Sequence, residues 1–183
     1  MVDLRAADVV IAGEVVDQFA GDFAVGLGDT DGDGLGDLAI SGEMSLSGRS
    51  WVFSGPLASG PVSSARTSFV GEAQDDLAGA SLARAGDADG DGLADLLIGA
   101  YAVNTPLVDA GAAYLVFGPF AAGSQSLTGQ ARFTGEADGD MAGRNVAGGG
   151  DYDGDGLADL LIAAPYSDAG GAFGGAAYVV TEH

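Results

Sequence analysis

The sequence of 183 residues lacks cysteine and lysine, and its single histidine, His183, stands at the last position. Without cysteine no disulfide bond can constrain the fold, and the redox compartment stays open. A catalytic triad cannot be assembled either, because Ser–His–Asp and Cys–His arrangements need a histidine held inside the fold. We therefore expect that the protein is not an enzyme.

Positive charge is also scarce. The chain has 27 acidic residues against six basic ones, all of them arginine, and its formal net charge is −21. Such a chain would repel nucleic acid, whose phosphates require a positive surface, and also an anionic membrane unless calcium bridged the two. No apolar run is long enough to span a bilayer, so no membrane span is expected.

Helical periodicity is absent from the sequence, and its 33 glycines would be costly in helices. Hydrophobic residues make up 47% of the chain, which at this length is enough to bury a core. We therefore expect an all-β fold.

Aspartate is abundant, and it is concentrated in three copies of one nine-residue loop. Each copy has aspartate at positions 1, 3, 5 and 9 and glycine at position 6. Carboxylates supply the hard oxygens that calcium prefers, position 7 can add its backbone carbonyl, and the glycine permits a sharp turn. Without a cation, four carboxylates so close together would repel one another. The sequence thus predicts three Ca²⁺ sites, with the ligands Asp29, Asp31, Asp33, Leu35 and Asp37; Asp87, Asp89, Asp91, Leu93 and Asp95; and Asp151, Asp153, Asp155, Leu157 and Asp159.

Other interpretations of these loops were weighed. An EF-hand would flank the loop with helices and place a bidentate glutamate at position 12. Position 12 is instead isoleucine within an apolar run, at Ile40, Ile98 and Ile162, which excludes the EF-hand. The remaining alternatives are an Asp/Gly-rich turn without an ion and a calcium ion whose role is purely architectural.

The loops belong to a longer repeat. Asp87 follows Asp29 by 58 residues, and Asp151 follows Asp87 by 64. A Gly-Glu pair recurs 15 residues before each loop, and an apolar-Ala-Gly step lies between the pair and the loop. A period of about sixty residues indicates modules that are stacked or arranged radially.

Each module is expected to contain strands, here termed A to D in chain order, because it carries runs of β-branched, aromatic and small apolar residues. The A strands are expected at 23–28, 81–86 and 145–150, and the B strands at 38–40, 96–98 and 160–162. The C strands are expected at 50–53, 113–117 and 177–180, and the D strands at 68–70 and 131–134.

The spacing Gly-Glu, Ala-Gly and Gly-Asp-x-Asp-Gly-Asp-Gly-Leu-x-Asp-Leu, followed by Ile98-Gly99-Ala100-Tyr101 or Ile162-Ala163-Ala164-Pro165, resembles the FG-GAP repeat. The resemblance covers about residues 8–180. It implies the calcium-binding β-propeller of integrin α subunits and of many bacterial secreted proteins. Two modules depart from the pattern, with Ser41-Gly42-Glu43 in place of Gly-Ala-Pro and Tyr101 in place of the proline, and neither change touches the metal ligands.

On this resemblance the modules would be three four-stranded propeller blades, at about 13–70, 71–134 and 135–183. Residues 8–12, ahead of the first Gly-Glu pair, would be a D strand that completes the last blade. The order D-ABCD-ABCD-ABC is the offset by which propellers close. Because propellers have four to eight blades, we expect either two chains in a six-bladed ring or part of a longer propeller, and we favour the homodimer.

Other polar and aromatic residues were assigned structural roles. The Gly-Glu glutamates could form a paired-carboxylate glycosidase site, but such a pair needs two unlike environments and these residues repeat; they are Glu14, Glu72 and Glu136. The aromatic residues that stand at the same position of each C strand are expected in the core or between blades; they are Trp51, Tyr114 and Tyr178. Arg84 and Arg144 are expected to offset the acidic excess.

The resemblance implies a non-enzymatic scaffold for protein or glycan contact, extracellular or at the cell surface, where millimolar calcium would fill the loops. We expect the ligand surface on the longer B-to-C loops, at 101–111 and 166–175. Met1–Arg5 do not form a signal peptide, so a secreted chain would come from a precursor. The rival interpretations are a non-catalytic propeller portion of a larger secreted enzyme and an excised or engineered fragment that only self-assembles.

Overall fold

The computed structural model describes residues 3–42, 47–104 and 106–181. Regular structure in these residues is almost entirely β, because the helical segments are two 3-10 turns, η1 (Leu4–Ala6) and η2 (Val62–Ser64). The expected all-β fold is confirmed. Neither helical segment in this part of the chain has the length and apolar character that a membrane crossing requires.

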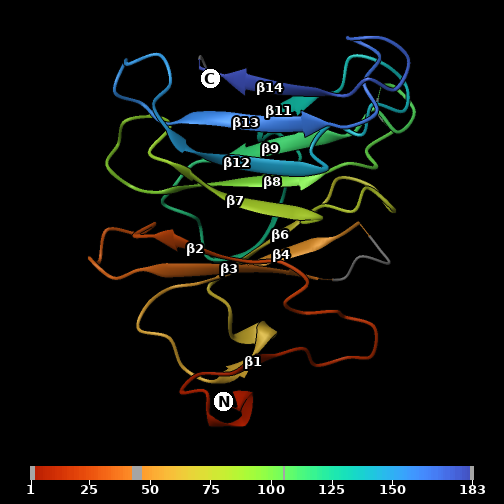
Figure 1. Ribbon diagram of the computed structural model, residues 1–183. Coiled ribbons are helices and arrows are strands. Elements are labelled where there is room, and N and C mark those ends of the chain that lie inside the picture. The colour runs from red at the N-terminus through yellow and green to blue at the C-terminus, as the bar shows by residue number, and fades with distance from the viewer. Residues whose placement is uncertain (1–2, 43–46, 105, 182–183) are drawn as a thin grey trace.

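Three sheets follow one another along the chain and stack as layers (Figure 1). Sheet 1 contains β2 (Ala24–Gly28), β3 (Asp37–Gly42), β4 (Arg49–Phe53) and β6 (Thr67–Val70). Sheet 2 contains β7 (Ser81–Gly86), β8 (Asp95–Ala100), β9 (Ala112–Val116) and β11 (Ala131–Thr134). Sheet 3, within the described residues, contains β12 (Asn145–Gly150), β13 (Asp159–Ala164) and β14 (Ala176–Val180). These strands pair antiparallel with their neighbours in the chain.

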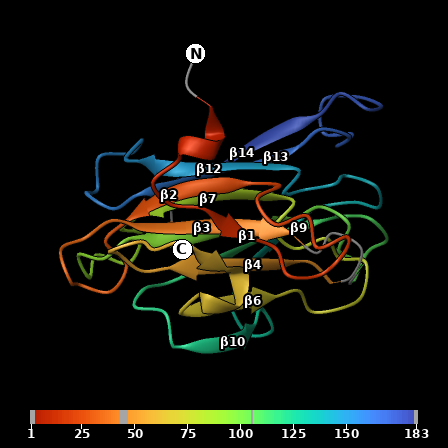
Figure 2. The same ribbon diagram turned by 90° about the horizontal axis from the view of Figure 1, so that it is seen from below.

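Two short strands from the connections between the third and fourth strands pair in parallel with a strand outside their own sheet. β10 (Gly123–Ser126) lies in the connection between β9 and β11, yet it pairs with β6 at the outer edge of sheet 1 (Figure 2). β5 (Gly60–Pro61), in the corresponding connection of sheet 1, pairs with β1 (Ile11–Ala12). The sequence predicts a strand over 8–12, and its last two residues form β1.

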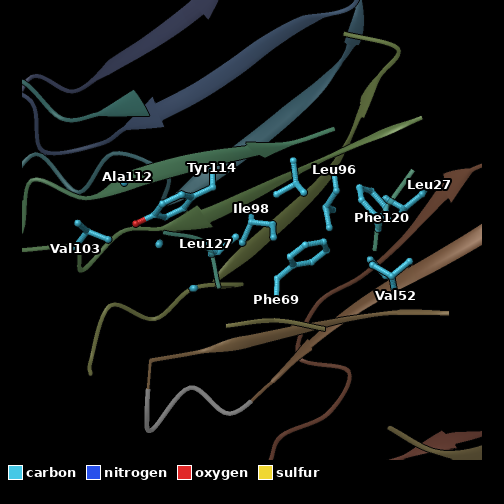
Figure 3. Close-up of a cluster of buried hydrophobic side chains, with 14 residues drawn as sticks. Leu27, Val52, Phe69, Leu96, Ile98, Val103, Ala112, Tyr114, Phe120 and Leu127 are labelled. Atoms are coloured by element: carbon cyan, nitrogen blue, oxygen red, sulfur yellow. The ribbon is translucent and has the colours of Figure 1, made fainter. Parts of the chain in front are cut away.

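The hydrophobic core lies between the sheets. The cluster between sheets 1 and 2 includes Leu27, Val52, Leu96 and Tyr114 (Figure 3). The cluster between sheets 2 and 3 includes Leu97, Leu115, Leu160 and Ile162. Every residue of β8 and β9 is buried because sheet 2 is covered on both faces, which explains why these strands are apolar throughout.

The connections divide between the two sides of the stack, because successive antiparallel strands run in opposite directions. The three acidic loops, between β2 and β3, β7 and β8, and β12 and β13, lie on the left in Figure 1. The loops between β8 and β9 and between β13 and β14 lie on the right. The fold therefore brings the three candidate metal loops to one side of the molecule.

Candidate metal centre

The first aspartate of each acidic loop is held by the backbone of its own loop. Asp29 accepts N–H bonds from Gly32 at 2.7 Å through one carboxylate oxygen and from Gly34 at 2.9 Å through the other. The same two bonds recur at Asp87 and Asp151, with lengths between 2.6 and 3.1 Å. The three loops therefore share one backbone design around this carboxylate.

Glycine makes this design possible at loop positions 4 and 6. All six of these glycines have a positive φ, between 78° and 95°, which other residues adopt only with strain. The special role predicted for the position-6 glycine is confirmed, and the structure adds the same role for position 4. The glycines are Gly32, Gly34, Gly90, Gly92, Gly154 and Gly156.

Aspartates at positions 3 and 5 form local turns. In the first loop, Asp31 accepts from the Asp33 amide at 3.3 Å, and Asp33 accepts from the Leu35 amide at 2.7 Å, each through one oxygen. The other two loops repeat both bonds. Side chains that bond to the backbone two residues ahead stabilise a turn without a helix or strand. The role predicted for the position-7 carbonyls of Leu35, Leu93 and Leu157 stays a prediction.

The aspartate at position 9 is buried, with an exposed fraction of 4% at Asp37 and 0% at Asp95 and Asp159. One of its oxygens accepts from the backbone amide of loop position 2, at 2.9 Å from Thr30 and 2.7 Å from Ala88. Asp159 accepts in the same way from Tyr152. This residue therefore closes the loop at the start of the second strand.

The structure brings three predicted ligands of each loop together. One oxygen from each member lies within 4.8 Å of the others, in the groups Asp29, Asp31 and Asp33; Asp87, Asp89 and Asp95; and Asp151, Asp153 and Asp159. A cluster of carboxylate oxygens on a loop whose amides already orient the first ligand fits the coordination that Ca²⁺ requires. The predicted ligands Asp91 and Asp155 lie in the same loops but outside these groups, as Asp37 does in the first loop.

Burial and hydrogen bonding shift two of the ligand pKa values in opposite directions. Donation from the backbone, chiefly from Gly34, lowers the pKa of Asp29. Burial raises the pKa of Asp95, and the nearby Asp89 and Asp91 carboxylates add to the increase, although the Gly118 and Ala88 amides oppose it. A bound divalent cation would favour the ionised form of Asp95, so the loop chemistry favours a metal at neutral pH more than at acidic pH.

The first loop differs from the other two. Arg66 forms an ion pair with Asp31, and the Thr30 hydroxyl bonds to Asp37. The corresponding residues at position 2 of the other loops, Ala88 and Tyr152, do not offer an aliphatic hydroxyl. Two predicted ligands of the first loop are thus each engaged by a side chain of the protein.

Sequence reasoning missed the groups that hold the position-9 aspartate from outside the loop. The amide of Gly55 donates to Asp37 at 3.0 Å, and the amide of Gly118 donates to Asp95 at 2.8 Å. The signal was present as a Gly-Pro step after the C strand, at Gly55-Pro56 and Gly118-Pro119. These bonds tie the first and second acidic loops to the end of the third strand of their sheets.

The Gly-Glu glutamates make structural contacts where their partners are described. Glu14 accepts from the backbone N–H and the hydroxyl of Ser63, at 3.0 and 2.9 Å. Glu72 forms an ion pair of 2.7 Å with Arg132. In the described part of the chain, the Glu136 side chain has no hydrogen-bond or ion-pair partner. Two of the three glutamates therefore fix connections, as expected of a structural residue.

The aromatic residues on the third strands lie in the core, as predicted. Trp51 and Tyr114 have exposed fractions of 3% and 0%, and Tyr178 is partly buried against the cluster between sheets 2 and 3. Burial raises the pKa of Tyr114 to about 12. Arg144 stacks over the ring of Tyr101, with the guanidinium carbon 4.4 Å from the ring centroid, so this arginine packs a loop as well as offsetting acidic charge.

Comparison with known proteins identifies two repeats in the chain. Residues 78–116 and 142–180 are FG-GAP repeats, each covering the first three strands and the acidic loop of sheets 2 and 3. FG-GAP repeats often bind Ca²⁺ and are typical of extracellular domains. A search among curated proteins found no match to the chain.

Proposed function

From the two FG-GAP repeats, we propose that this protein is a non-catalytic calcium-binding β-propeller module that acts as an extracellular scaffold. The observation that supports calcium most directly is the repetition of one loop design three times, including the first loop, which lies outside the two matched segments. Each loop would hold one Ca²⁺ through its aspartates, with the backbone amides fixing their orientation. The ion would join the first, second and third strands of its sheet into one rigid unit.

The same proposal treats each sheet as a propeller blade. Sheets 1, 2 and 3 would be blades 1, 2 and 3, with the four strands of a blade in the order A to D. Sheets 1 and 2 contain all four, and the described part of sheet 3 contains A, B and C. In this account β1 is a D strand that stands ahead of blade 1. Two chains of three blades would together form one six-bladed ring.

A partner would bind on the side opposite the acidic loops. Apolar side chains are exposed there on the B-to-C loops, where Val108, Tyr166 and Phe173 have exposed fractions of 60%, 45% and 77%. The D-to-A connection ahead of β2 adds Val16 and Phe19, at 88% and 60%. Exposed apolar and aromatic side chains on loops carried by a rigid scaffold suit contact with a protein or a glycan.

Calorimetric titration of the chelator-treated protein with CaCl₂ tests the metal sites. We expect three Ca²⁺ per chain, and one fewer in each of the variants Asp31→Asn, Asp89→Asn and Asp153→Asn. Asp75→Asn, which removes an exposed carboxylate outside the loops, is the matched control and should keep three. Absence of heat in the wild-type titration, or loss of binding in the control, would contradict the proposal.

A further inference from the structure

A buried apolar side chain from the C-to-D connection fills the outer part of two blades. Val62, in blade 1, is 1% exposed and packs with Ile40, Trp51 and Ile11. Leu127, in blade 2, is 0% exposed and lies in the cluster with Phe69, Ile98 and Tyr114 (Figure 3). Both residues precede the D strand of their own blade by a few positions. Each also lies two residues after a residue, Gly60 or Gln125, that pairs in parallel with the D strand ahead of that blade. We term them plug residues.

Blade 3 has a pocket where its plug residue would lie. The pocket has a volume of about 260 Å³ and is mainly apolar. Its wall residues Phe133, Ala142, Ile162, Tyr178 and Val180 each lie 64 positions after a residue of the cluster that buries Leu127. That set is Phe69, Ala78, Ile98, Tyr114 and Val116. The pocket is thus the counterpart of a space that a plug residue fills in blade 2.

The N-terminal segment repeats the segment that carries the plug of blade 1. The turn η1 precedes η2 by 58 residues, which is the spacing of the first two modules, and each turn is followed by an alanine with nearly the same backbone angles, φ −65° and ψ 139° at Ala7 and φ −57° and ψ 138° at Ala65. Leu4 stands at the position of Val62. Val62 is buried, whereas Leu4 is 88% exposed. Leu4 therefore stands at a plug position, on a turn that is already formed, but its side chain is exposed.

β1, the strand that follows this turn, pairs with its neighbour in the same way as the D strand β6. Ile11 of β1 pairs with Gly60, two residues before the plug Val62, as Phe69 of β6 pairs with Gln125, two residues before the plug Leu127. The other edge of β6 pairs with the C strand β4, whereas the other edge of β1 has no strand beside it in the described residues. In the same described part of the chain, the outer edge of β14, the C strand of blade 3, has no strand beside it. β1 and β14 lie at opposite ends of the stack (Figure 1), so they do not meet within one chain.

We propose that the blade 3 pocket receives Leu4 of a second copy of this chain, whose β1 adds to the free edge of β14 as the fourth strand. The pairing of β11 with β9 sets the register, because Thr134 lies opposite Ala112 and Phe133 opposite Ala113. The equivalent register places Ala12 of the second copy opposite Ala176, and Ile11 opposite Ala177. This inference rests on the proposed assembly of two chains and names the surfaces that form it.

The charged residues next to the pocket and next to Leu4 support a second copy of the chain as the occupant of the pocket. Glu14 binds Ser63, the residue after the plug Val62. The equivalent glutamate at the pocket is Glu136, which lines it and has no side-chain partner in the described residues. The residue after Leu4 is Arg5, which is exposed and forms an ion pair with the exposed Asp3. The second copy would thus place Arg5 beside Glu136, which could accept hydrogen bonds from its guanidinium.

The glycine of the apolar-Ala-Gly step supports the same contact. A Cβ placed on Gly79 would lie 2.9 Å from the Ser41 Cβ of blade 1, and one placed on Gly143 would meet the Ala112 carbonyl of blade 2. Gly21, the equivalent in blade 1, has no atom within 4 Å of such a Cβ. At two blade interfaces this glycine lets the preceding blade pack closely against it. At the first blade no such neighbour is present, and a second copy would pack there.

Light scattering behind a sizing column, in calcium, tests the proposal. The wild type should have twice the 17.9 kDa chain mass. Leu4→Asp should raise the dimer dissociation constant roughly 100-fold, because an unpaired carboxylate would enter an apolar pocket. Arg5→Glu should also weaken the dimer, and Arg5→Glu combined with Glu136→Arg should restore it. Val108→Asp, on the exposed B-to-C loop of blade 2, is the control and should leave the mass unchanged.

Cysteine pairs test the register, because the natural chain has no cysteine. Ala12→Cys with Ala176→Cys should form a disulfide between chains, whereas Ala12→Cys with Ala177→Cys should not, because neighbouring residues point to opposite faces. A monomeric wild type would overturn both the assembly and this inference. A dimer that tolerates Leu4→Asp and does not cross-link would overturn this inference alone. Calcium titration of the same samples reports separately on the metal sites.

Discussion

At the scale of single residues, aspartate and glycine have complementary roles in the acidic loops. The aspartates accept backbone N–H bonds in the same pattern in all three loops, and the glycines at positions 4 and 6 supply the positive φ that allows it. Because both residue types recur at fixed spacing, the three loops could be predicted from sequence, and Ca²⁺ binding by their aspartates stays a prediction. The engagement of Asp31 by Arg66 could not be predicted, because it depends on a residue 35 positions away that the fold brings near.

Alanine substitutions at two glycines of the first loop allow the effect of backbone strain to be measured apart from that of steric crowding. Gly34 has φ +82° and Gly36 an ordinary φ, and a Cβ on either would meet nothing within 4 Å. Gly34→Ala should lower the free energy of unfolding by about 1–2 kcal/mol. Gly36→Ala should raise it by about 0.5 kcal/mol, because alanine loses less backbone entropy on folding. Chemical denaturation of both variants in calcium measures the difference, and equal effects would contradict this explanation of the loop.

The ion pair between Arg66 and Asp31 should weaken the first calcium site. We expect a wild-type titration with one site weaker than the other two. Arg66→Gln should tighten that site by about fivefold, since an exposed ion pair contributes up to about 1 kcal/mol. Arg5→Gln, which removes an exposed arginine far from the loop, should change none of the three constants. Three equal sites in the wild type would show that the ion pair does not oppose calcium.

Asp76 should give the fold a pH dependence that is independent of the metal loops. Burial raises its pKa above 3.8, while the Ala73 amide, 2.8 Å away, opposes the shift. A raised folded-state pKa means that the protonated form is favoured in the fold, so stability is lost as pH rises from 3.8 through the folded pKa. Asp76→Asn should remove this loss, and blade 1 already has the uncharged Gln18 at the same position.

The measurement is thermal unfolding of wild type and Asp76→Asn between pH 3 and 7 in chelator. The variant should gain stability relative to wild type as pH rises, and the gain should level off above the folded pKa of Asp76. Asp75→Asn removes the adjacent exposed carboxylate and should give a smaller change. A difference between wild type and Asp76→Asn that does not vary with pH would contradict the assignment.

At the scale of elements, the strands next to the acidic loops could be predicted well. The runs 81–86 and 145–150 form β7 and β12 with the predicted bounds, and the run 131–134, away from these loops, forms β11 with its predicted bounds. The loop, with its glycines, marks where one strand ends and the next begins. By contrast, β5, β10 and the two 3-10 turns were not predicted. Gly123–Ser126 is polar and has no apolar alternation, and it is a strand only because β6 offers it a free edge in another sheet.

The connection that contains β10 should hold sheets 1 and 2 together through the buried side chain of Leu127. Leu127 is fully buried, and the Phe120 ring of the same connection lies 5.5 Å from the ring of Phe69 in an edge-to-face contact. Leu127→Ala should lower the free energy of unfolding by about 3 kcal/mol, through lost burial and the cavity left behind. Thr128→Ala, at the exposed neighbouring position, should change it by less than about 0.5 kcal/mol. Chemical denaturation distinguishes the two, and similar effects would contradict the role of the plug.

At the scale of the whole molecule, the chain is a stack of similar sheets whose cores lie between neighbours. Sheet 2 is covered on both faces and has strands that are buried throughout, whereas β14 at the end of the stack keeps Val179 52% exposed. A repeat protein of this kind gains stability from each interface between modules. The all-β class and the repeats were predictable from sequence, but the open pocket of sheet 3 was not, because its walls come from four separate segments of the chain that only the fold brings together.

We expect calcium in the acidic loops to rigidify this stack. Thermal unfolding of the protein in millimolar CaCl₂ and in excess chelator, at neutral pH, measures this effect. Calcium at 100 times its dissociation constant would stabilise the fold by about 2.7 kcal/mol for each site that binds only the folded chain. The melting temperature should therefore be much lower in chelator than in calcium. An identical melting temperature in the two conditions would contradict the claim.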